Sequence, residues 1–180
     1  TCYKAALDSG ADVVVMVHPD YQYTPLLLCA MASLITTGLY EVVLASRILG
    51  GKTRSSGMPA WRYMSNRFLT LFQNVLLHAK LSEYHTGYRA YSRKVLLSID
   101  FEKNSDDFIF DNQILAQVLM KDFPIGEVSC PTKYFPDASS INFQRSVQYG
   151  FGVLAVSLVF RLHRMGLYRS PLFTSSKEAP

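Results

Sequence analysis

The feature that most constrains the fold is an apolar run, Ala-Asp-Val-Val-Val-Met-Val, at residues 11–17. Consecutive β-branched side chains put apolar groups on both faces of a strand, which is typical of a parallel sheet covered by helices. A short helical pattern at residues 4–9 precedes the run and ends at Gly10. Helix, glycine and buried strand in this order form half of a doubly wound unit. The sequence therefore predicts an α/β fold with a mostly parallel sheet flanked by helices.

The rest of the chain continues this alternation. Thr24 and Pro25 form a helix start, with Thr as N-cap and Pro in the first turn. Further strands are predicted at residues 41–46 and 125–130, and further helices at 59–80, 92–99, 111–120 and 143–164. Residues 83–91 are predicted to form a turn-rich loop. The helix at 59–80 carries an apolar stripe, which we expect to face the core, at Met64, Phe68, Leu71, Phe72 and Val75.

Composition narrows the class of protein. The 180 residues are 49% hydrophobic and 18% charged, which predicts one folded domain rather than a disordered chain. The net charge of +4 favours an anionic partner such as a nucleotide or a phospholipid headgroup. Nucleic acid is not predicted as a partner, because the aromatic residues have core spacing and do not alternate with basic ones.

Cysteine usage and apolar run length indicate the compartment. Cys2, Cys29 and Cys130 are widely spaced and form no Cys-x-x-Cys pair, which favours reduced thiols in a cytosolic setting. The apolar run at residues 149–160 is shorter than the ~20 residues that a membrane-spanning helix needs. We therefore expect no membrane-spanning helix.

The first candidate site directly follows the buried strand, in the segment His18-Pro19-Asp20-Tyr21-Gln22. Ligands of open α/β sheets bind at the carboxyl ends of the strands. Asp20 offers a hard oxygen to Mg²⁺ or Mn²⁺, and Gln22 offers a carbonyl oxygen. His18 is either a ligand of Mn²⁺ or a partner of a loop carbonyl. The alternative is that these residues only form a turn before the next helix.

A second candidate is a set of basic side chains. One guanidinium group can bind phosphate with two parallel hydrogen bonds, so a set of arginines suits a diphosphate. Its members follow the second predicted strand and begin the next helix: Arg47, Lys52, Arg54, Arg62 and Arg67. Arg89 closes the tight turn at residues 85–89 and is predicted to point into the same cleft. The alternative reading is a solvated basic loop with an incidental arginine in the turn.

Carboxylates and the last helix complete the candidates. Asp107 and Asp111 lie at the start of the helix at 111–120, where a carboxylate is either a cap or a general base. The last helix has apolar residues along one face and cations near its ends, which fits either a helix on anionic lipid or a helix packed on the core. The apolar positions are Phe143, Val147, Phe151, Leu154, Leu158 and Leu162, and the cations are Arg145, Arg161, His163 and Arg164.

These segments, in this order, resemble the family 2 glycosyltransferases of the dolichyl-phosphate-sugar synthase type. Residues 14–25 (VVMVHPDYQYTP) are similar to the family's D-A-D-x-Q-x-x-P motif, with His18 in place of the first Asp. Residues 45–47 (ASR) resemble its G-S-R strand end, and residues 81–91 (LSEYHTGYRAY) its D-x-x-S-G-F-R-A-Y segment. Residues 110–115 (FDNQIL) and 125–131 (IGEVSCP) resemble F-D-T-E-I-L and I-x-E-V-P. The family's R-x-x-G-x-S-K stretch is replaced by residues 136–142 (PDASSIN).

The resemblance implies a GT-A (Rossmann-like) half-domain at residues 1–142, with the N-terminal nucleotide-binding units absent. An amphipathic, membrane-associating helix at 143–168 and a disordered tail at 169–180 would follow. It implies a hexosyltransferase that uses a nucleotide-sugar donor and a polyprenyl-phosphate or glycan acceptor, peripheral at the cytoplasmic face of a membrane and serving a cell envelope polysaccharide. The truncated chain itself need not be active.

The resemblance also implies roles for single residues. Mg²⁺ or Mn²⁺ would be held by Asp20, Gln22 and His18, and substrates by Arg47, Arg62, Arg89, Thr86 and Gln113. Asp107 or Asp111 would be the base if the acceptor is a hydroxyl. The alternative is a degenerate, non-catalytic module that binds lipid phosphate or a partner protein.

Overall fold

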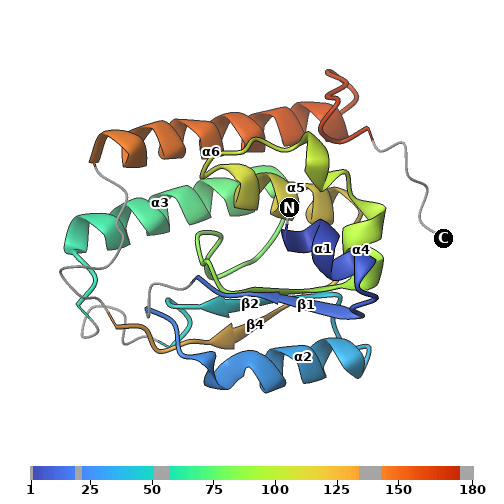
Figure 1. Cartoon of the computed structure of the whole chain (residues 1–180). Helices are drawn as coiled ribbons and strands as arrows, with labels where there is room; N and C mark the ends of the chain where they lie inside the picture. Colours follow the sequence, from blue (N-terminus) through green and yellow to red (C-terminus); the bar gives the residue numbers. More distant parts are fainter. Residues whose placement is uncertain (1, 19–21, 51–56, 134–142, 175–180) are drawn as a thin grey trace.

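The computed structural model describes residues 2–18, 22–50, 57–133 and 143–174. Its centre is a four-stranded sheet in the order β1-β3-β2-β4 (Figure 1). The strands are β1 (Val13–Met16), β2 (Val42–Ser46), β3 (Arg89–Ser92) and β4 (Ile125–Ser129). Strands β1, β2 and β4 share one direction, and β3 runs against both of its neighbours. The α/β class and the shared direction of most strands are as the sequence predicts.

Strand β3 differs from the sequence prediction, which placed residues 83–91 in a loop. Its residues pair with two strands that are distant in the chain: Ala90 lies opposite Val15 of β1 and Val43 of β2. The four residues Arg-Ala-Tyr-Ser have no alternating pattern of their own. Tertiary pairing alone makes this segment a strand, which is why local pattern did not reveal it.

Helices cover both faces of the sheet. Helix α2 (Leu28–Thr36) lies on one face, and α3 (Ala60–Leu77), α5 (Phe110–Met120) and α6 (Phe143–Arg164) lie on the other (Figure 1). Strand β2 is buried throughout, so its side chains enter two cores: Leu44 packs with Leu115 of α5, and Val43 packs with Met31 of α2. The short helices α1 (Cys2–Asp8) and α4 (Arg93–Ser98) flank the sheet.

Two helix starts agree with the capping chemistry of the sequence. Thr24 Oγ1 accepts a hydrogen bond from the Leu26 amide at 3.4 Å, at the start of a 3₁₀ turn (Pro25–Leu27) before α2. Ser92 Oγ accepts one from the Val95 amide at 3.2 Å and caps α4. Helix α5 begins at Phe110 after Ile109 as N-cap, so Asp111 lies in its first turn and is not the cap.

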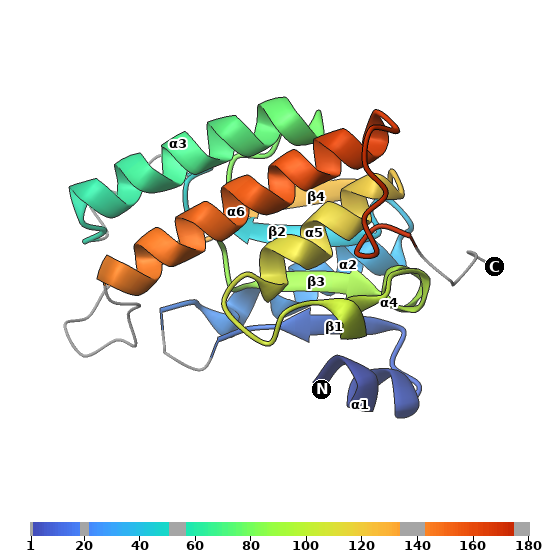
Figure 2. The same cartoon turned by 90° about the horizontal axis from the view of Figure 1, so that it is seen from above.

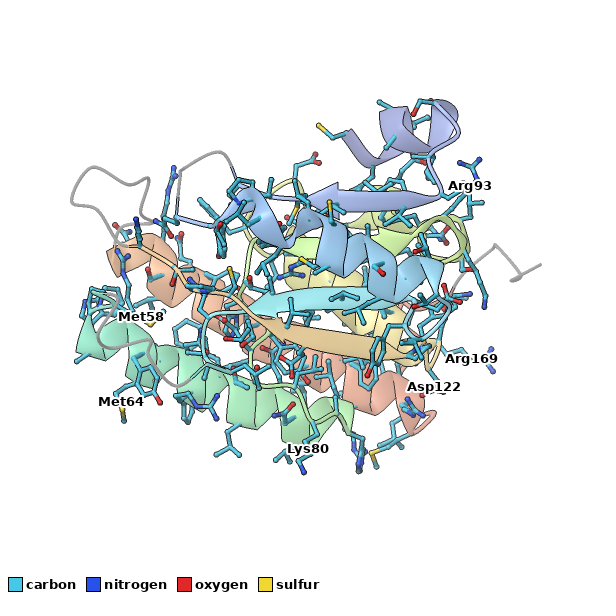
Figure 3. The ribbon with its side chains drawn as sticks, turned by 90° about the horizontal axis from the view of Figure 1, so that it is seen from below. Met58, Met64, Lys80, Arg93, Asp122 and Arg169 are labelled. Carbon is cyan, nitrogen blue, oxygen red and sulfur yellow. The ribbon has the colours of Figure 1, made fainter. Side chains whose placement is uncertain are left out.

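The side of helix α3 that faces the protein interior is not the one that the sequence predicts. Its stripe of Met64, Phe68, Leu71 and Val75 is 62–66% exposed, and Met64 points outward from the helix (Figure 3). The face toward the protein is mostly polar, with buried Asn66, Thr70, Gln73 and Leu77. These amides bond to other buried groups, as Asn66 Nδ2 does to Glu83 Oε1 at 2.8 Å. Partners distant in the chain make this polar face the inner one, so apolar periodicity predicted the wrong side.

Helix α6 lies beside α3 and across α5 (Figure 2). Its inner side carries Val153, Ser157 and Phe160, whereas Val147, Phe151 and Leu158 of the predicted apolar face are exposed. The tail beyond residue 168 is not disordered as far as Thr174, because Phe173 packs edge-on against Phe160 with ring centroids 5.6 Å apart. None of the helices in the described segments is long and apolar enough to cross a bilayer.

Candidate active site

A cleft of about 280 Å³ opens where the carboxyl ends of β1 and β2 meet the segment that leads into β3. Helices α3, α5 and α6 complete its wall. Its polar and charged lining residues are His18, Gln22, Tyr23, Arg47, Arg62, Ser65, Asn66, His85, Arg89, Asp111, Ser146 and Tyr149. Its apolar lining residues include Met58, Trp61, Leu69 and Phe108. The cleft lies at the sheet edge where the sequence predicts ligands of an α/β protein.

Two of the three predicted metal ligands, His18 and Gln22, line this cleft. The third, Asp20, lies outside the described residues. The His18 ring lies so close to Gly87 that a Cβ added there would be 2.5 Å from the ring atoms Cε1 and Nδ1. The Gly87 amide also donates to Tyr23 Oη at 3.0 Å. Glycine at position 87 therefore lets the end of β1 and the segment before β3 form one wall.

No group of three His, Cys, Asp or Glu side chains in the described segments is arranged to hold a metal ion. An imidazole nitrogen and an amide oxygen on one wall nevertheless suit Mn²⁺, which accepts nitrogen and oxygen ligands. The donor chemistry of His18 and Gln22 therefore fits a divalent ion.

Arg47 is bound to a buried carboxylate. Glu83 is fully buried, and its Oε2 accepts from the Arg47 amide at 2.8 Å while its Oε1 accepts from Arg47 Nε at 2.9 Å. Arg47 Nη2 donates to Glu83 Oε1 and, at 2.9 Å, to the His85 carbonyl. Burial raises the pKa of Glu83, but the charge and hydrogen bonds of Arg47 together lower it by more. The pKa of Glu83 is therefore below its usual value. Arg47 thus shapes the cleft through Glu83.

Arg89 also differs from its predicted role as a phosphate ligand. Its side chain is 1% exposed. Its nitrogen atoms donate to three backbone carbonyls: Nε to Thr86 at 2.7 Å, Nη1 to Asp111 at 2.7 Å and Nη2 to Tyr84 at 2.8 Å. These bonds join the segment before β3 to the first turn of α5. Arg89 is therefore a scaffold residue, although one edge of it lines the cleft.

Three further predicted site residues lie outside the cleft lining. Thr86 Oγ1 donates to the Ala45 carbonyl at 2.7 Å and is buried. Gln113 Oε1 accepts from the Ser105 amide at 2.7 Å, and Asp107 Oδ1 accepts from the Phe108 amide at 2.7 Å. Each side chain bonds to nearby backbone, and its predicted substrate or base role stays a prediction.

Arg62 and Asp111 remain as partly buried charged groups of the cleft lining. Arg62 lies 5.2 Å from the centre of the Trp61 ring, and its buried Nε has no hydrogen-bond partner in the described part of the chain. Asp111 is the one carboxylate among the described lining residues, with its side chain 21% exposed and Oδ2 4.0 Å from Arg89 Nη2. Lys52 and Arg54 lie outside the described residues, and Arg67 Nη1 donates to the Ser82 carbonyl at 2.8 Å.

No pattern in the sequence pointed to several residues of the site. Asn66 and Ser65 lie on the polar side of α3, which local pattern assigns to solvent. Tyr149 of α6 reaches the cleft and shares a 2.8 Å hydrogen bond with His85 Nδ1. Burial lowers the pKa of His85 to about 3, so the ring is neutral at neutral pH. Long-range packing brings these residues together, so spacing in the chain could not have revealed them.

Comparison with known proteins identifies a relative of this chain by sequence. The sequence is 26% identical over 133 residues to the hexosyltransferase Agl6 of low-salt glycan biosynthesis in Haloferax volcanii. That match covers 74% of this chain and 31% of the relative. No protein-family profile matches the sequence.

Solved structures of glucosyl-3-phosphoglycerate synthase from Mycobacterium tuberculosis share the fold. The complex with uridine diphosphate has a TM-score of 0.61 and 15% identity, and the complex with Mn²⁺, UDP-glucose and glycerol 3-phosphate has a TM-score of 0.59 and 14% identity. Both matches cover 94% of this chain and 55% of the solved chain, so this chain spans about half the length of those structures. The chain thus has the α/β fold of GT-A glycosyltransferases, and its sequence is homologous to a hexosyltransferase.

Proposed function

We propose that the chain is part of a metal-assisted glycosyltransferase that transfers a sugar from a nucleotide-sugar to a polyprenyl-phosphate or glycan acceptor, with inversion at the sugar carbon. One observation carries the proposal: the cleft combines candidate metal ligands, a cation and a carboxylate at the carboxyl edge of a GT-A sheet. The homology to a hexosyltransferase supports the reaction class. The neighbouring structures that hold Mn²⁺ with UDP-glucose support the donor and cofactor class.

In this proposal His18 and Gln22, with Asp20, hold Mg²⁺ or Mn²⁺. The ion would neutralise charge on the donor diphosphate as the leaving group departs. Arg62 binds a phosphate oxygen of the donor or the acceptor, because its guanidinium is next to the cleft and is not held by a carboxylate in the described residues. Arg47 and Arg89 hold the wall in place through Glu83 and the backbone carbonyls.

The acceptor decides whether a base is needed. A polyprenyl phosphate is already an anion and attacks without losing a proton to the protein. A hydroxyl acceptor of a glycan needs a base, and Asp111 is the carboxylate of the described cleft lining that is placed for it. Asp107, which lies outside that lining, stays the second candidate for this base.

We further propose that this reaction takes place at a membrane surface, and the outer sides of α3 and α6 support that location. The cytoplasmic face is proposed because the widely spaced cysteines favour a reducing compartment. Exposed apolar side chains follow the length of both helices, which lie side by side. They are Trp61, Met64, Phe68, Leu71 and Val75 on α3 and Val147, Phe151 and Leu158 on α6, and we call them the apolar face. Apolar stripes exposed on two neighbouring helices support an interaction site here.

The charge of the two helices favours anionic lipid as the occupant of the apolar face. Neither α3 nor α6 contains an Asp or a Glu, and together they carry Arg62, Arg67, Arg145, Arg161 and Arg164. Cations around an apolar helical surface fit the boundary between phosphate headgroups and acyl chains. Trp61 belongs both to the apolar face and to the cleft lining, so a lipid phosphate would have a short route to the cleft.

Nucleotide and metal binding test the donor site. Thermal shifts would be recorded with UDP, GDP and TDP, each with and without Mn²⁺. We expect stabilisation that needs both one nucleotide and the metal, and that disappears in Asp20→Ala but survives in the exposed control Asp8→Ala. A folded chain that responds to no pair would favour the non-catalytic lipid- or partner-binding module. Product analysis by NMR would test inversion, since a retained anomer contradicts it.

Vesicle sedimentation tests the apolar face. Leu71→Asp would weaken binding to vesicles rich in anionic lipid, whereas Leu39→Asp would not, although Leu39 is equally exposed at 63% beyond the end of α2. Binding that is equal for both variants, or absent in the unchanged chain, would contradict the membrane proposal. Concentration-dependent dimerisation that Leu71→Asp abolishes would instead identify a second copy as the occupant.

A further inference from the structure

His85 is a partly buried histidine on the cleft wall, and one of its ring nitrogens has no hydrogen-bond partner among the described residues. Its Nδ1 lies 2.8 Å from Tyr149 Oη, but its Nε2 is buried and has no hydrogen-bond partner among the described residues. A buried polar atom without a hydrogen-bond partner destabilises the folded state, so a native protein rarely keeps one without a function. His85 lines the cleft, where a ligand can supply the missing partner.

A chain of hydrogen bonds from three helices sets which nitrogen of His85 carries the proton. Gln73 Nε2 of α3 donates to Asn112 Oδ1 of α5 at 2.9 Å, so Asn112 turns its Nδ2 toward Tyr149 of α6. The Tyr149 oxygen accepts from Asn112 Nδ2. The Tyr149 hydroxyl proton is then free to be donated to His85 Nδ1. An imidazole that accepts at Nδ1 and is neutral has its proton on Nε2.

Electrostatics keep this arrangement in place. Burial lowers the pKa of His85 to about 3, so the ring does not take a second proton at neutral pH. Burial raises the pKa of Tyr149, so its hydroxyl keeps the proton that it donates. The backbone of His85 is also held, because its carbonyl accepts from Arg47 Nη2 at 2.9 Å.

The geometry points to His85 Nε2–H as a neutral hydrogen-bond donor for a phosphate oxygen in the cleft, with Tyr149, Asn112 and Gln73 as the residues that position it. The choice of a phosphate rests on the proposed function. It is also supported by Arg62, whose guanidinium lines the same cleft with an unpaired Nε among the described residues. The phosphate belongs either to the nucleotide-sugar diphosphate or to the acceptor lipid, since both present the same oxygen atoms. A neutral donor adds direction to a site in which Arg62 already supplies charge.

The test begins with the tautomer of His85 in the ¹⁵N-labelled chain. Long-range ¹H–¹⁵N spectra should show His85 protonated at Nε2, and titration with inorganic pyrophosphate should shift that Nε2–H signal. Tyr149→Phe removes the hydroxyl that fixes the tautomer, so the Nδ1–H form should become populated. A ring protonated at Nδ1 in the unchanged chain would overturn the assignment. So would an Nε2–H signal that neither saturating pyrophosphate nor a saturating short-chain prenyl monophosphate moves, because a buried water would then be its partner.

Binding of phosphate probes supplies the second readout. His85→Leu should weaken pyrophosphate binding at least about tenfold, the value of a hydrogen bond to a charged group. His85→Gln should recover most of the affinity, since its Nε2 can replace the lost donor, whereas His85→Asn should not. Affinity equal to that of the unchanged chain in all three variants, for pyrophosphate and for a short-chain prenyl monophosphate alike, would overturn the assignment.

Two probes separate the sources of the phosphate. A loss confined to pyrophosphate assigns His85 to the donor diphosphate, and a loss confined to a short-chain prenyl monophosphate assigns it to the acceptor. Failure of the proposed function can be told apart from failure of the His85 assignment. Absence of sugar transfer would contradict the proposed function, whereas the Nε2–H signal and the binding of phosphate probes test His85 alone.

Discussion

Glu83 is fully buried, and Arg47 contacts both of its carboxylate oxygens, through the backbone amide and through the guanidinium. Asn66 Nδ2 of α3 adds a further bond to Oε1 at 2.8 Å. This pair joins the end of β2, the segment before β3 and the inner face of α3. Its geometry fixes the wall against which the cleft is built.

Glu83→Gln should lower the free energy of unfolding by about 3–5 kcal/mol. The Arg47 side chain is only 13% exposed, and the substitution removes the carboxylate that balances its charge. Glu102→Gln is the matched control, since the Lys4–Glu102 pair is on the surface, with both side chains more than half exposed. That control should cost less than about 1 kcal/mol. Urea unfolding at pH 7 measures both, and equal costs would contradict a structural role for the pair.

The free energy of unfolding should decrease in acid, and the lowered pKa of His85 should cause part of that decrease. Burial lowers the pKa of His85 from 6.5 to about 3 in the folded chain. Below pH 6.5 the unfolded chain therefore binds a proton that the folded chain does not. The contribution of His85 is complete above pH 6.5 and is lost as the pH falls toward 3, at up to about 1.4 kcal/mol per pH unit. Urea unfolding from pH 7 to 4.5 should show a loss that is about 2–3 kcal/mol smaller in His85→Gln. Parallel pH profiles for the two proteins would contradict a neutral buried His85.

Gly87→Ala should disturb the wall formed by His18. The added Cβ would lie 2.5 Å from two atoms of the His18 ring, so the ring has to move, and we expect a cost of about 1–3 kcal/mol. The chemical shifts of the His18 ring should change with it. Gly150→Ala in α6 is the control, because its nearest atom, Leu69 Cδ1, is 4.0 Å away. That change should stabilise the helix by about 0.5–1 kcal/mol. A His18 signal that Gly87→Ala leaves in place would count against the close approach.

Substitution of Arg89 should reduce mainly stability, whereas substitution of Arg62 should reduce mainly pyrophosphate binding. Arg89→Ala removes the donors to three buried carbonyls and should cost at least about 3 kcal/mol of stability. Arg62→Ala should change stability by less than about 1 kcal/mol. It should nevertheless weaken pyrophosphate binding about tenfold or more, because Arg62 is the cation placed to meet a phosphate. Calorimetric titration and urea unfolding of both variants provide the comparison. Loss of stability in Arg62→Ala with no change in binding would reverse the two roles.

Phe173→Ala should destabilise the chain by about 3 kcal/mol, because the ring is 9% exposed and packs against Phe160. Phe151→Ala, which removes a ring that is 69% exposed, should change stability by less than about 0.5 kcal/mol. Thermal unfolding compares the two. A negligible effect at Phe173 would mean that residues 169–174 do not contribute to the core.

The sequence predicted the fold class and the position of the cleft because both depend on local pattern. A run such as residues 11–17 stays apolar on both faces only in a sheet covered on both sides, and β1 at Val13–Met16 belongs to such a sheet. The segment after it is polar, and His18 and Gln22 line the cleft at that sheet edge. The cap at Thr24 was equally predictable, since it is a hydrogen bond to the Leu26 amide two residues along the chain.

Local sequence patterns were therefore enough to predict strands, caps, turns and the polar residues that follow a strand. The tertiary structure alone decided which side of α3 faces inward, that Arg47 and Arg89 serve the scaffold, and that Tyr149 reaches His85. The physical reason is that a buried polar side chain is stable only when a partner satisfies it, and here the partners come from distant segments. Asn66 is buried because Glu83 is there to accept from it, 17 residues along the chain. Side-chain periodicity records no such partner, so it placed the apolar stripe of α3 inside and the polar one outside.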